Sequence, residues 1–128
     1  MEGPVRRSAL LCLLDPSLQA ELRAALSNPE LDVHTYTCSE LSECCGQLTQ
    51  SPDILFCPLS KDLRTIVTSH QPDAIVIVVS RVPDTREWIS AMEAGASDYC
   101  APPFEYSQLR WMLNAAGHGS PVLRPASA

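Results

Sequence analysis

The sequence predicts an α/β domain in which a parallel sheet is covered by helices on both faces. Five short runs of apolar, strand-prone residues alternate with amphipathic helical segments through most of the 128 residues. This alternation is typical of parallel βαβ units. The strand runs are apolar throughout rather than at every second residue, which indicates strands that are buried on both faces. The length of the chain suits one domain.

The first strand is expected at residues 8–14, where the run SALLCLL lies between charged residues and an Asp-Pro pair. Asp15 is a favourable N-cap, and Pro16 suits the first position of a helix. Leucines and alanines then recur at helical spacing up to about residue 27. The first strand therefore leads directly into the first helix.

The next elements are a strand at 32–36, a helix and a strand at 53–57. Thr37 and Glu40 match the capping box that begins many helices. The apolar face expected for this helix consists of Leu41, Cys44, Cys45 and Leu48. The run DILFC at 53–57 predicts a third buried strand.

The second half of the chain continues the alternation. The expected elements are a helix at 61–69, a strand at 73–80, a helix at 83–94, a strand at 97–101 and a helix at 105–116. Asp84 and Glu87 form an acidic start for the helix at 83–94, and Gly95 suits the residue that follows its end. Five strands and five helices are thus predicted in alternating order.

Residues 8–116 are expected to form the domain, after an N-terminal lead at 1–7. Residues 117–128 are rich in Gly, Pro and Ser and are expected to form a flexible tail. The apolar run near the N-terminus is too short for a signal peptide, and no segment is long enough to span a membrane. We therefore expect a cytoplasmic protein that does not bind membranes.

Composition argues against several classes of function. Nine basic residues are outnumbered by fifteen acidic ones, giving a net charge of −6, so nucleic-acid binding is not expected. No Gly-rich phosphate loop follows the first strand, and the six cysteines lack metal-ligand spacing, so no cofactor or metal is expected. The cysteines are interpreted as reduced, buried apolar residues. A redox pair of Cys44 and Cys45 is the alternative.

Residues 73–113 resemble the second half of a response-regulator receiver domain. The most specific stretch is EAGASDY at 93–99, followed by Pro103-Phe104 and Leu109, while Ser80 matches the family's Thr or Ser after strand four. The stretch LLCLLDPSLQAELRAAL is similar to the opening of the family. The resemblance implies a flavodoxin-like three-layer sandwich with strand order 2-1-3-4-5, in a protein of two-component, phosphorelay signal transduction.

The charged groups of the family's phosphorylation site are replaced in this sequence. The resemblance implies an acidic pair that holds Mg²⁺, an aspartate that accepts the phosphoryl group and a lysine that stabilises it. The matching positions are Leu13 and Leu14, Pro58, and Pro102. Asp15 and Ser80 remain at this degenerate pocket. Mg²⁺ requires oxygen ligands, and phosphoryl transfer requires charge neutralisation, which leucine and proline cannot provide.

Three functions follow from these residues. The first is a pseudo-receiver, not an enzyme, that acts by protein–protein interaction without aspartyl phosphorylation. The second is a phosphorylation-dependent response regulator with an atypical site, using Asp15, Asp53 or Asp62. Asp53 is expected at the wrong end of its strand for this role. The third is a small enzyme or thiol-based redox module that uses Cys57, Cys44 or Cys45. Its motive is that Cys57 is expected at the switch point of the sheet.

The resemblance also implies a surface for a protein partner or a homodimer, on the side formed by helix four, strand five and helix five. Trp88 and Trp111 lie near that side and are candidate interface residues. Tyr99 matches the aromatic switch of the family. Pro103 matches a proline whose preceding peptide is cis, so a cis bond between Pro102 and Pro103 is expected.

Overall fold

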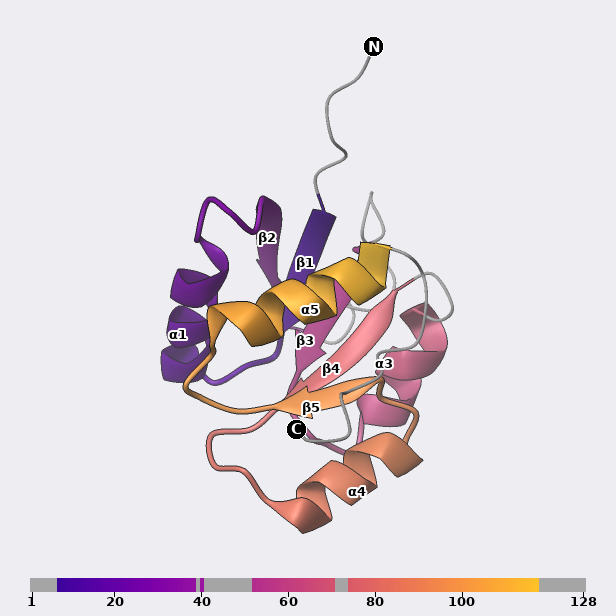
Figure 1. The fold of residues 1–128 in the computed structure, drawn as a ribbon. Coiled ribbons are helices and arrows are strands. Elements are labelled where there is room, and N and C mark those ends of the chain that lie inside the picture. Colours follow the sequence, from indigo (N-terminus) through magenta and orange to yellow (C-terminus); the bar gives the residue numbers. More distant parts are fainter. Residues whose placement is uncertain (1–6, 39, 41–51, 71–73, 118–128) are drawn as a thin grey trace.

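A computed structural model describes residues 7–38, 40, 52–70 and 74–117, which contain a five-stranded parallel sheet (Figure 1). The strands are β1 (Arg7–Cys12), β2 (Val33–Cys38), β3 (Ile54–Cys57), β4 (Ile75–Val79) and β5 (Asp98–Cys100). Their order across the sheet is β2-β1-β3-β4-β5. The predicted fold class and strand order are therefore confirmed.

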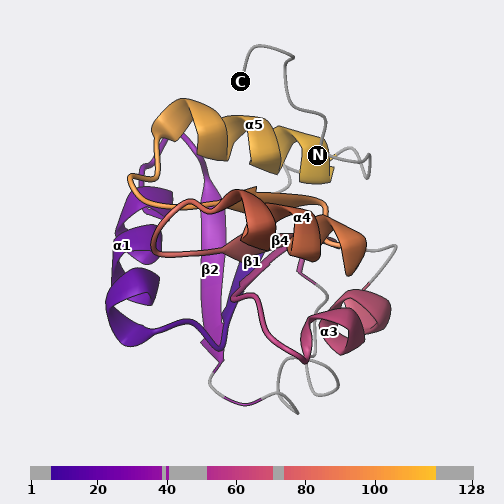
Figure 2. The ribbon, with the colours of Figure 1, turned by 90° about the horizontal axis from the view of Figure 1, so that it is seen from below.

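Helices cover both faces of this sheet. Within the described residues the helices are α1 (Pro16–Leu26), α3 (Leu63–His70), α4 (Thr85–Glu93) and α5 (Tyr106–Gly117). Figure 2 shows α5 and α3 on opposite sides of the sheet. The helix predicted from the pattern of Leu41, Cys44, Cys45 and Leu48 lies outside the described residues, as does the tail from residue 118.

The apolar core is divided by the sheet into two clusters. One cluster joins Ala9 and Leu11 to the buried leucines of α1 and α5. The other joins Leu10 and Cys12 to the buried residues of α3 and α4. Successive side chains of a strand point to opposite faces, so each strand contributes to both clusters. This arrangement explains why the strand runs are apolar at every position.

The parallel register brings the carboxyl ends of four strands to one edge of the sheet. Leu11 of β1 pairs with Phe56 of β3, and Cys57 pairs with Val78 of β4. Val79 in turn pairs with Cys100 of β5. The loops that follow β1, β3, β4 and β5 consequently meet at this edge, where the candidate site lies.

The carboxyl ends of β1 and β2 differ from the boundaries expected from the sequence. β1 ends at Cys12, since Leu13 adopts a positive φ of 63° that a strand cannot contain. β2 extends to Cys38 and pairs there with Cys12, so Thr37 lies inside a strand. The prediction that Thr37 caps a helix is therefore wrong.

Other local predictions are confirmed. The Asp15 side chain accepts a hydrogen bond from the Leu18 amide at 3.1 Å and caps α1. The Pro102–Pro103 peptide is cis. Gly95 has a φ of 105°, and a Cβ added there would lie 3.0 Å from Cγ1 of Val67, so this turn requires glycine.

Candidate functional site

The positions singled out from the sequence follow neighbouring strands at the carboxyl edge. Residues 13–15 follow β1, Pro58 follows β3, Ser80 follows β4 and Pro102 is close behind β5. The backbone amide of Ser80 donates to the carbonyl of Cys100 at 2.9 Å, which ties the β4 loop to the end of β5. The fold therefore gathers these segments at one edge, as the sequence predicts.

The two leucines after β1 serve as core residues. Leu13 is half-buried and packs against the cluster that contains α3 and α4, while its amide donates to the Cys38 carbonyl at 3.0 Å. Leu14 is only 7% exposed and belongs to the opposite cluster, with Leu18 of α1. One leucine thus packs on each side of the sheet, and neither side chain offers an oxygen to a metal ion.

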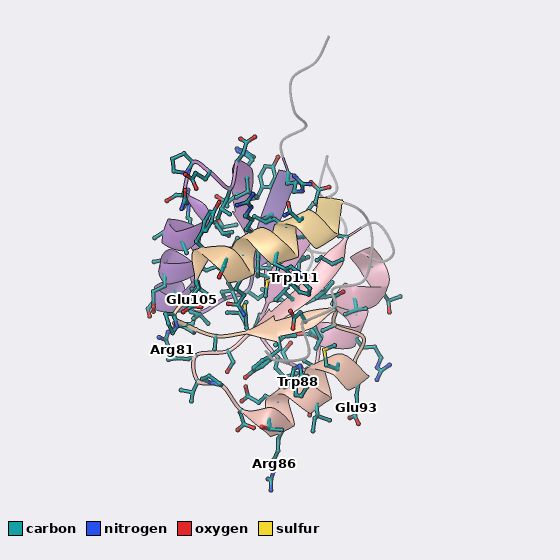
Figure 3. All side chains as sticks on the ribbon, viewed as in Figure 1. Arg81, Arg86, Trp88, Glu93, Glu105 and Trp111 are labelled. Carbon is teal, nitrogen blue, oxygen red and sulfur yellow. The ribbon has the colours of Figure 1, made fainter. Side chains whose placement is uncertain are left out.

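Asp15 is the carboxylate that remains beside these leucines, and it is already engaged. Its side chain caps α1 through the Leu18 amide and contacts the guanidinium of Arg81, which follows Ser80. Arg81 also donates to Oγ of Ser17 at 2.8 Å. Figure 3 shows Arg81 beside the α1 side of the molecule. The hydrogen bond from Leu18, together with the charge of Arg81, lowers the pKa of Asp15 below its ordinary value of 3.8.

We expect Asp15→Asn to keep the helix cap and to remove a pH-dependent contribution to stability. Asparagine is a good N-cap but carries no charge to pair with Arg81. Because the folded pKa is lowered, the ionised carboxylate stabilises the fold above 3.8, and this stabilisation is lost as the pH falls through the folded pKa. On acidification, the melting temperature of the wild type should fall more steeply than that of Asp15→Asn. An equal dependence of the two melting temperatures on pH would show that the ionised Asp15 does not stabilise the fold.

Ser80 and Tyr99 are connected through one carboxylate of α4. The Ser80 hydroxyl donates to Oε1 of Glu87 at 2.8 Å, and the Tyr99 hydroxyl donates to the same oxygen at 3.1 Å. The Val82 carbonyl lies 3.0 Å from the Ser80 hydroxyl. Tyr99 is 7% exposed. Burial raises the pKa of Tyr99 above 10.0, and the hydrogen bond and charge of Glu87 raise it further. We call Ser80, Glu87 and Tyr99 the Glu87 network.

The Glu87 network corrects one interpretation of the sequence. Asp84 caps α4 as predicted, accepting from the amides of Arg86 and Glu87 at 2.8 and 3.3 Å. The Glu87 side chain, however, points to Ser80 and Tyr99 and takes no part in the cap. The reason is its place on α4, where it lies one turn from the fully buried Ala91, on the side that faces the sheet.

The other acidic candidates are placed as follows. Asp53 lies at the amino end of β3, where its carboxylate accepts from the Ser8 amide at 2.8 Å. This is the opposite edge of the sheet, as the sequence predicts. Asp62 lies in the loop before α3, and its carbonyl accepts from the Ile66 amide at 3.0 Å. Within the described parts of the chain, no three His, Cys, Asp or Glu residues are grouped closely enough to hold a metal ion.

The described cysteines are buried, and one forms a disulfide. Cys38, Cys57 and Cys100 are buried, with Cys57 fully covered at the end of β3. Cys12 is disulfide-bonded, so the prediction that all the cysteines are reduced is wrong at this position, because sequence spacing alone does not fix pairing. The pair of Cys44 and Cys45 lies outside the described residues. Burial of Cys57 argues against the redox hypothesis, since reactive cysteines are partly exposed.

The two tryptophans differ in exposure. Trp88 on α4 is 45% exposed and lies beside the exposed Ile89 and Met92. Trp111 on α5 is half-buried and packs against the core cluster of α1 and α5. Trp88 therefore remains a candidate interface residue, whereas Trp111 contributes mainly to the core.

Several solved structures with a similar fold are described as response regulators or receiver domains. The BeF3-activated receiver domain of DrrB is 16% identical, with 89% of this chain and 99% of that chain covered and a TM-score of 0.67. A response regulator from Thermotoga maritima is 20% identical, with 90% and 98% covered and a TM-score of 0.67. A CheY-like receiver domain protein from Methanospirillum hungatei JF-1 is 12% identical, with 90% and 97% covered and a TM-score of 0.66.

The chain has the receiver fold. No protein-family model matches the sequence, and no curated protein matches it. In the described residues no helix is both long enough and apolar enough to cross a membrane. The receiver resemblance thus extends from the quoted sequence stretches to the whole sheet and its helices.

The residues at the carboxyl edge of this receiver fold do not fit the Mg²⁺ ion that the resemblance implies. Such an ion requires oxygen ligands with near-octahedral geometry. Leu13 and Leu14 provide hydrocarbon, and the Asp15 carboxylate is shared between the α1 cap and Arg81. We therefore derive no chemical step through a metal ion.

Two residues of this edge were not predicted from the sequence as functional. No sequence pattern singles out Arg81, and the pattern at Glu87 indicates only a helix start. A signal for Arg81 is its place directly after Ser80, which the strand order puts on the same edge as Asp15. For Glu87 the signal is weaker, because only its spacing of four from the buried Ala91 indicates an inward direction.

Proposed function

We propose that this chain is a pseudo-receiver, a cytoplasmic signalling module that acts through protein–protein interaction without aspartyl phosphorylation and without enzymatic activity. One observation carries the proposal. Asp15, the carboxylate retained beside Leu13 and Leu14, caps α1 and contacts Arg81. Its negative charge is therefore paired with a cation of the chain itself and is not available to a metal ion. Pro58 and Pro102 supply neither a nucleophile nor a cation.

The Glu87 network supports the same proposal. In the receiver resemblance, Ser80 and Tyr99 are the positions that respond to the phosphoryl group. Here both hydroxyls donate to Glu87, at 2.8 and 3.1 Å, with Tyr99 buried. A carboxylate acceptor for both hydroxyls is therefore part of the chain, and their conformation requires no added phosphoryl group.

The surface for a partner is placed, as part of this proposal, on the α4 side of the molecule. Trp88, Ile89 and Met92 are 45%, 48% and 40% exposed there. Contiguous exposed apolar residues are typical of interaction sites, and tryptophan is enriched in their centres. Trp111 is not included, because it packs against the core.

The test is to treat the protein with acetyl phosphate and Mg²⁺ and to measure its intact mass, with the DrrB receiver domain, known in a BeF3-activated form, as the positive control. We expect no phosphoryl adduct on this chain under conditions that modify the control. Beryllofluoride with Mg²⁺ should likewise leave its amide NMR spectrum unchanged. A stable adduct on any aspartate would overturn the proposal and favour the phosphorylation-dependent alternative.

A further inference from the structure

Three cysteines lie on one face of the sheet, at the carboxyl ends of neighbouring strands. Cys38 ends β2, Cys12 ends β1 and Cys57 ends β3, and these strands are adjacent in the order β2-β1-β3 (Figure 1). The side chains of all three belong to the core cluster that faces α3 and α4. Cys12 therefore has a cysteine on the neighbouring strand at each side, whereas Cys100 belongs to the cluster on the opposite face.

Cys12 and Cys38 are paired directly in the parallel register. The pairing continues past the end of β1, because the Leu13 amide donates to the Cys38 carbonyl at 3.0 Å. Neighbouring strands lie about 4.8 Å apart, and the Cα atoms of a disulfide are about 4.4–6.8 Å apart. Both side chains also point to the same face of the sheet. A disulfide between Cys12 and Cys38 is therefore compatible with the backbone as it stands.

The structure contains a different disulfide at Cys12. Its second cysteine lies outside the described residues, because Cys38, Cys57 and Cys100 are thiols. A disulfide sulfur thus lies beside a thiol that is its partner in the strand register. This arrangement suits thiol–disulfide exchange, since in that reaction a thiolate must reach a disulfide sulfur directly.

We propose that Cys12 and Cys38 form a thiol–disulfide exchange site. The Cys38 thiolate attacks the sulfur of Cys12, a bond between Cys12 and Cys38 forms, and the bond from Cys12 to its present partner breaks. The partner sulfur leaves as a thiolate and takes up the proton that Cys38 has lost. One disulfide and one thiol are present before and after the step, so it needs neither oxidant nor reductant. The step replaces the present covalent bond at Cys12 by one that joins β1 to β2.

Exposure favours Cys38 over Cys57 as the attacking thiol. Cys38 lies on an edge strand of the sheet and is 8% exposed, whereas Cys57 lies on an inner strand and is fully buried. The thiolate is the nucleophile, and burial in apolar surroundings opposes its formation. The low exposure of Cys38 does not prevent the step, because its target is a sulfur on the neighbouring strand rather than a molecule in solvent.

The inference goes beyond the proposed function and does not rest on it. Exchange at Cys12 requires no phosphoryl group, metal ion or protein partner. It gives the domain two covalent states at the carboxyl edge, where the receiver resemblance places the phosphoryl group. The disulfide experiment and the test with acetyl phosphate therefore fail or succeed separately.

The experiment uses the full chain with its disulfide intact, kept at about pH 6 so that thiols stay protonated. The protein is brought to about pH 8 without oxidant, quenched with acid at increasing times, alkylated and digested with pepsin. Disulfide-linked peptides are then identified by mass spectrometry. We expect the linked pair of Cys12 and Cys38 to appear in at least about one molecule in ten, because its backbone geometry suits a disulfide.

Two alanine variants provide a matched comparison. C57A removes the other thiol beside Cys12, and we expect the pair of Cys12 and Cys38 to form at the wild-type rate within about twofold. C38A removes the attacking thiol, so Cys12 should keep its original partner at every time point. Circular dichroism of each variant separates a change of disulfide from a loss of folding.

A second measurement uses C44S/C45S, which lacks both cysteines outside the described residues. Oxidised glutathione should join Cys12 to Cys38 in this variant, taking up the two thiol hydrogens and leaving as reduced glutathione. The pair should form faster than any disulfide to Cys100, which lies on the opposite face of the sheet.

The proposal is overturned if the pair of Cys12 and Cys38 is absent from the wild type or from the folded double variant. It is also overturned if Cys12 joins Cys100 as fast as it joins Cys38, because that result requires exchange in the unfolded chain. Equally fast joining of Cys12 to Cys57 would remove the assignment of Cys38 as the attacking thiol.

Discussion

Leu14→Asp is expected to lower the free energy of unfolding by at least about 3 kcal/mol, because it removes a buried leucine and places a carboxylate in the core. Leu14 is 7% exposed and packs in the cluster of Leu18 and Leu22. A loss of this size is a large part of the stability of a small domain. The measurement is urea denaturation monitored by circular dichroism.

Adding Mg²⁺ distinguishes a core position from a vacant ligand position. If Leu14 merely replaced a metal ligand, the aspartate variant would recover stability in excess Mg²⁺. We expect no recovery, because the neighbouring Leu13 side chain offers no oxygen and Asp15 is engaged by Arg81. Leu14→Met is the matched control, since it conserves volume and should cost less than about 1.5 kcal/mol. A Leu14→Asp variant as stable as this control would show that the side chain is not part of the core.

The fold could be predicted because its signals are local. Continuous apolar runs such as 73–80 identify buried strands, and β4 lies at Ile75–Val79. Asp15 and Gly95 mark the start of one helix and the end of another through short-range hydrogen bonding and a positive φ. The receiver resemblance then supplied the strand order, which periodicity alone does not contain.

The contacts of the candidate site could not be predicted because they join distant segments. Arg81 and Asp15 are 66 residues apart in the sequence, and their contact depends on the side-chain direction of an exposed arginine. Tyr99 and Glu87 are 12 residues apart and meet because β5 and α4 pack together. A sequence pattern places such residues on the same edge of the sheet, but it does not determine which atoms are paired.

Local patterns also failed where tertiary pairing is stronger. Thr37 and Glu40 match a capping box, yet Thr37 continues β2 because that strand pairs with β1 as far as Cys12 and Cys38. Trp111 lies off the face marked by Leu109 in the sequence but still packs against the core. A large aromatic side chain reaches the core from the edge of a helix, so periodicity underestimates its burial.

Glu87→Ala is expected to destabilise the domain by about 1–3 kcal/mol, because the Ser80 and Tyr99 hydroxyls both lose their carboxylate acceptor. Tyr99 is buried, whereas Ser80 and Glu87 are half-buried, so water replaces only part of the lost acceptor. The unfolding midpoint in urea measures the loss. The exchange rate of the backbone amides should also rise in residues 80–84, because the Glu87 network joins this loop to β5. A midpoint and exchange rates equal to those of the wild type would refute a structural role for the network.

Glu87→Gln separates the charge of Glu87 from its hydrogen bonds. Glutamine keeps one acceptor oxygen, so we expect a smaller loss of stability than for Glu87→Ala.

Because the charge of Glu87 contributes to raising the pKa of Tyr99 above 10.0, that pKa should fall in Glu87→Gln while burial continues to raise it. A raised folded pKa stabilises the fold below 10.0, and this stabilisation is lost as the pH rises through the folded pKa. As the pH rises, Glu87→Gln should therefore lose the stabilisation from protonated Tyr99 at a lower pH than the wild type does. The tyrosinate absorbance of each protein, with Tyr99→Phe subtracted, tests this order, and an unchanged Tyr99 titration would show that the carboxylate charge does not act on the ring.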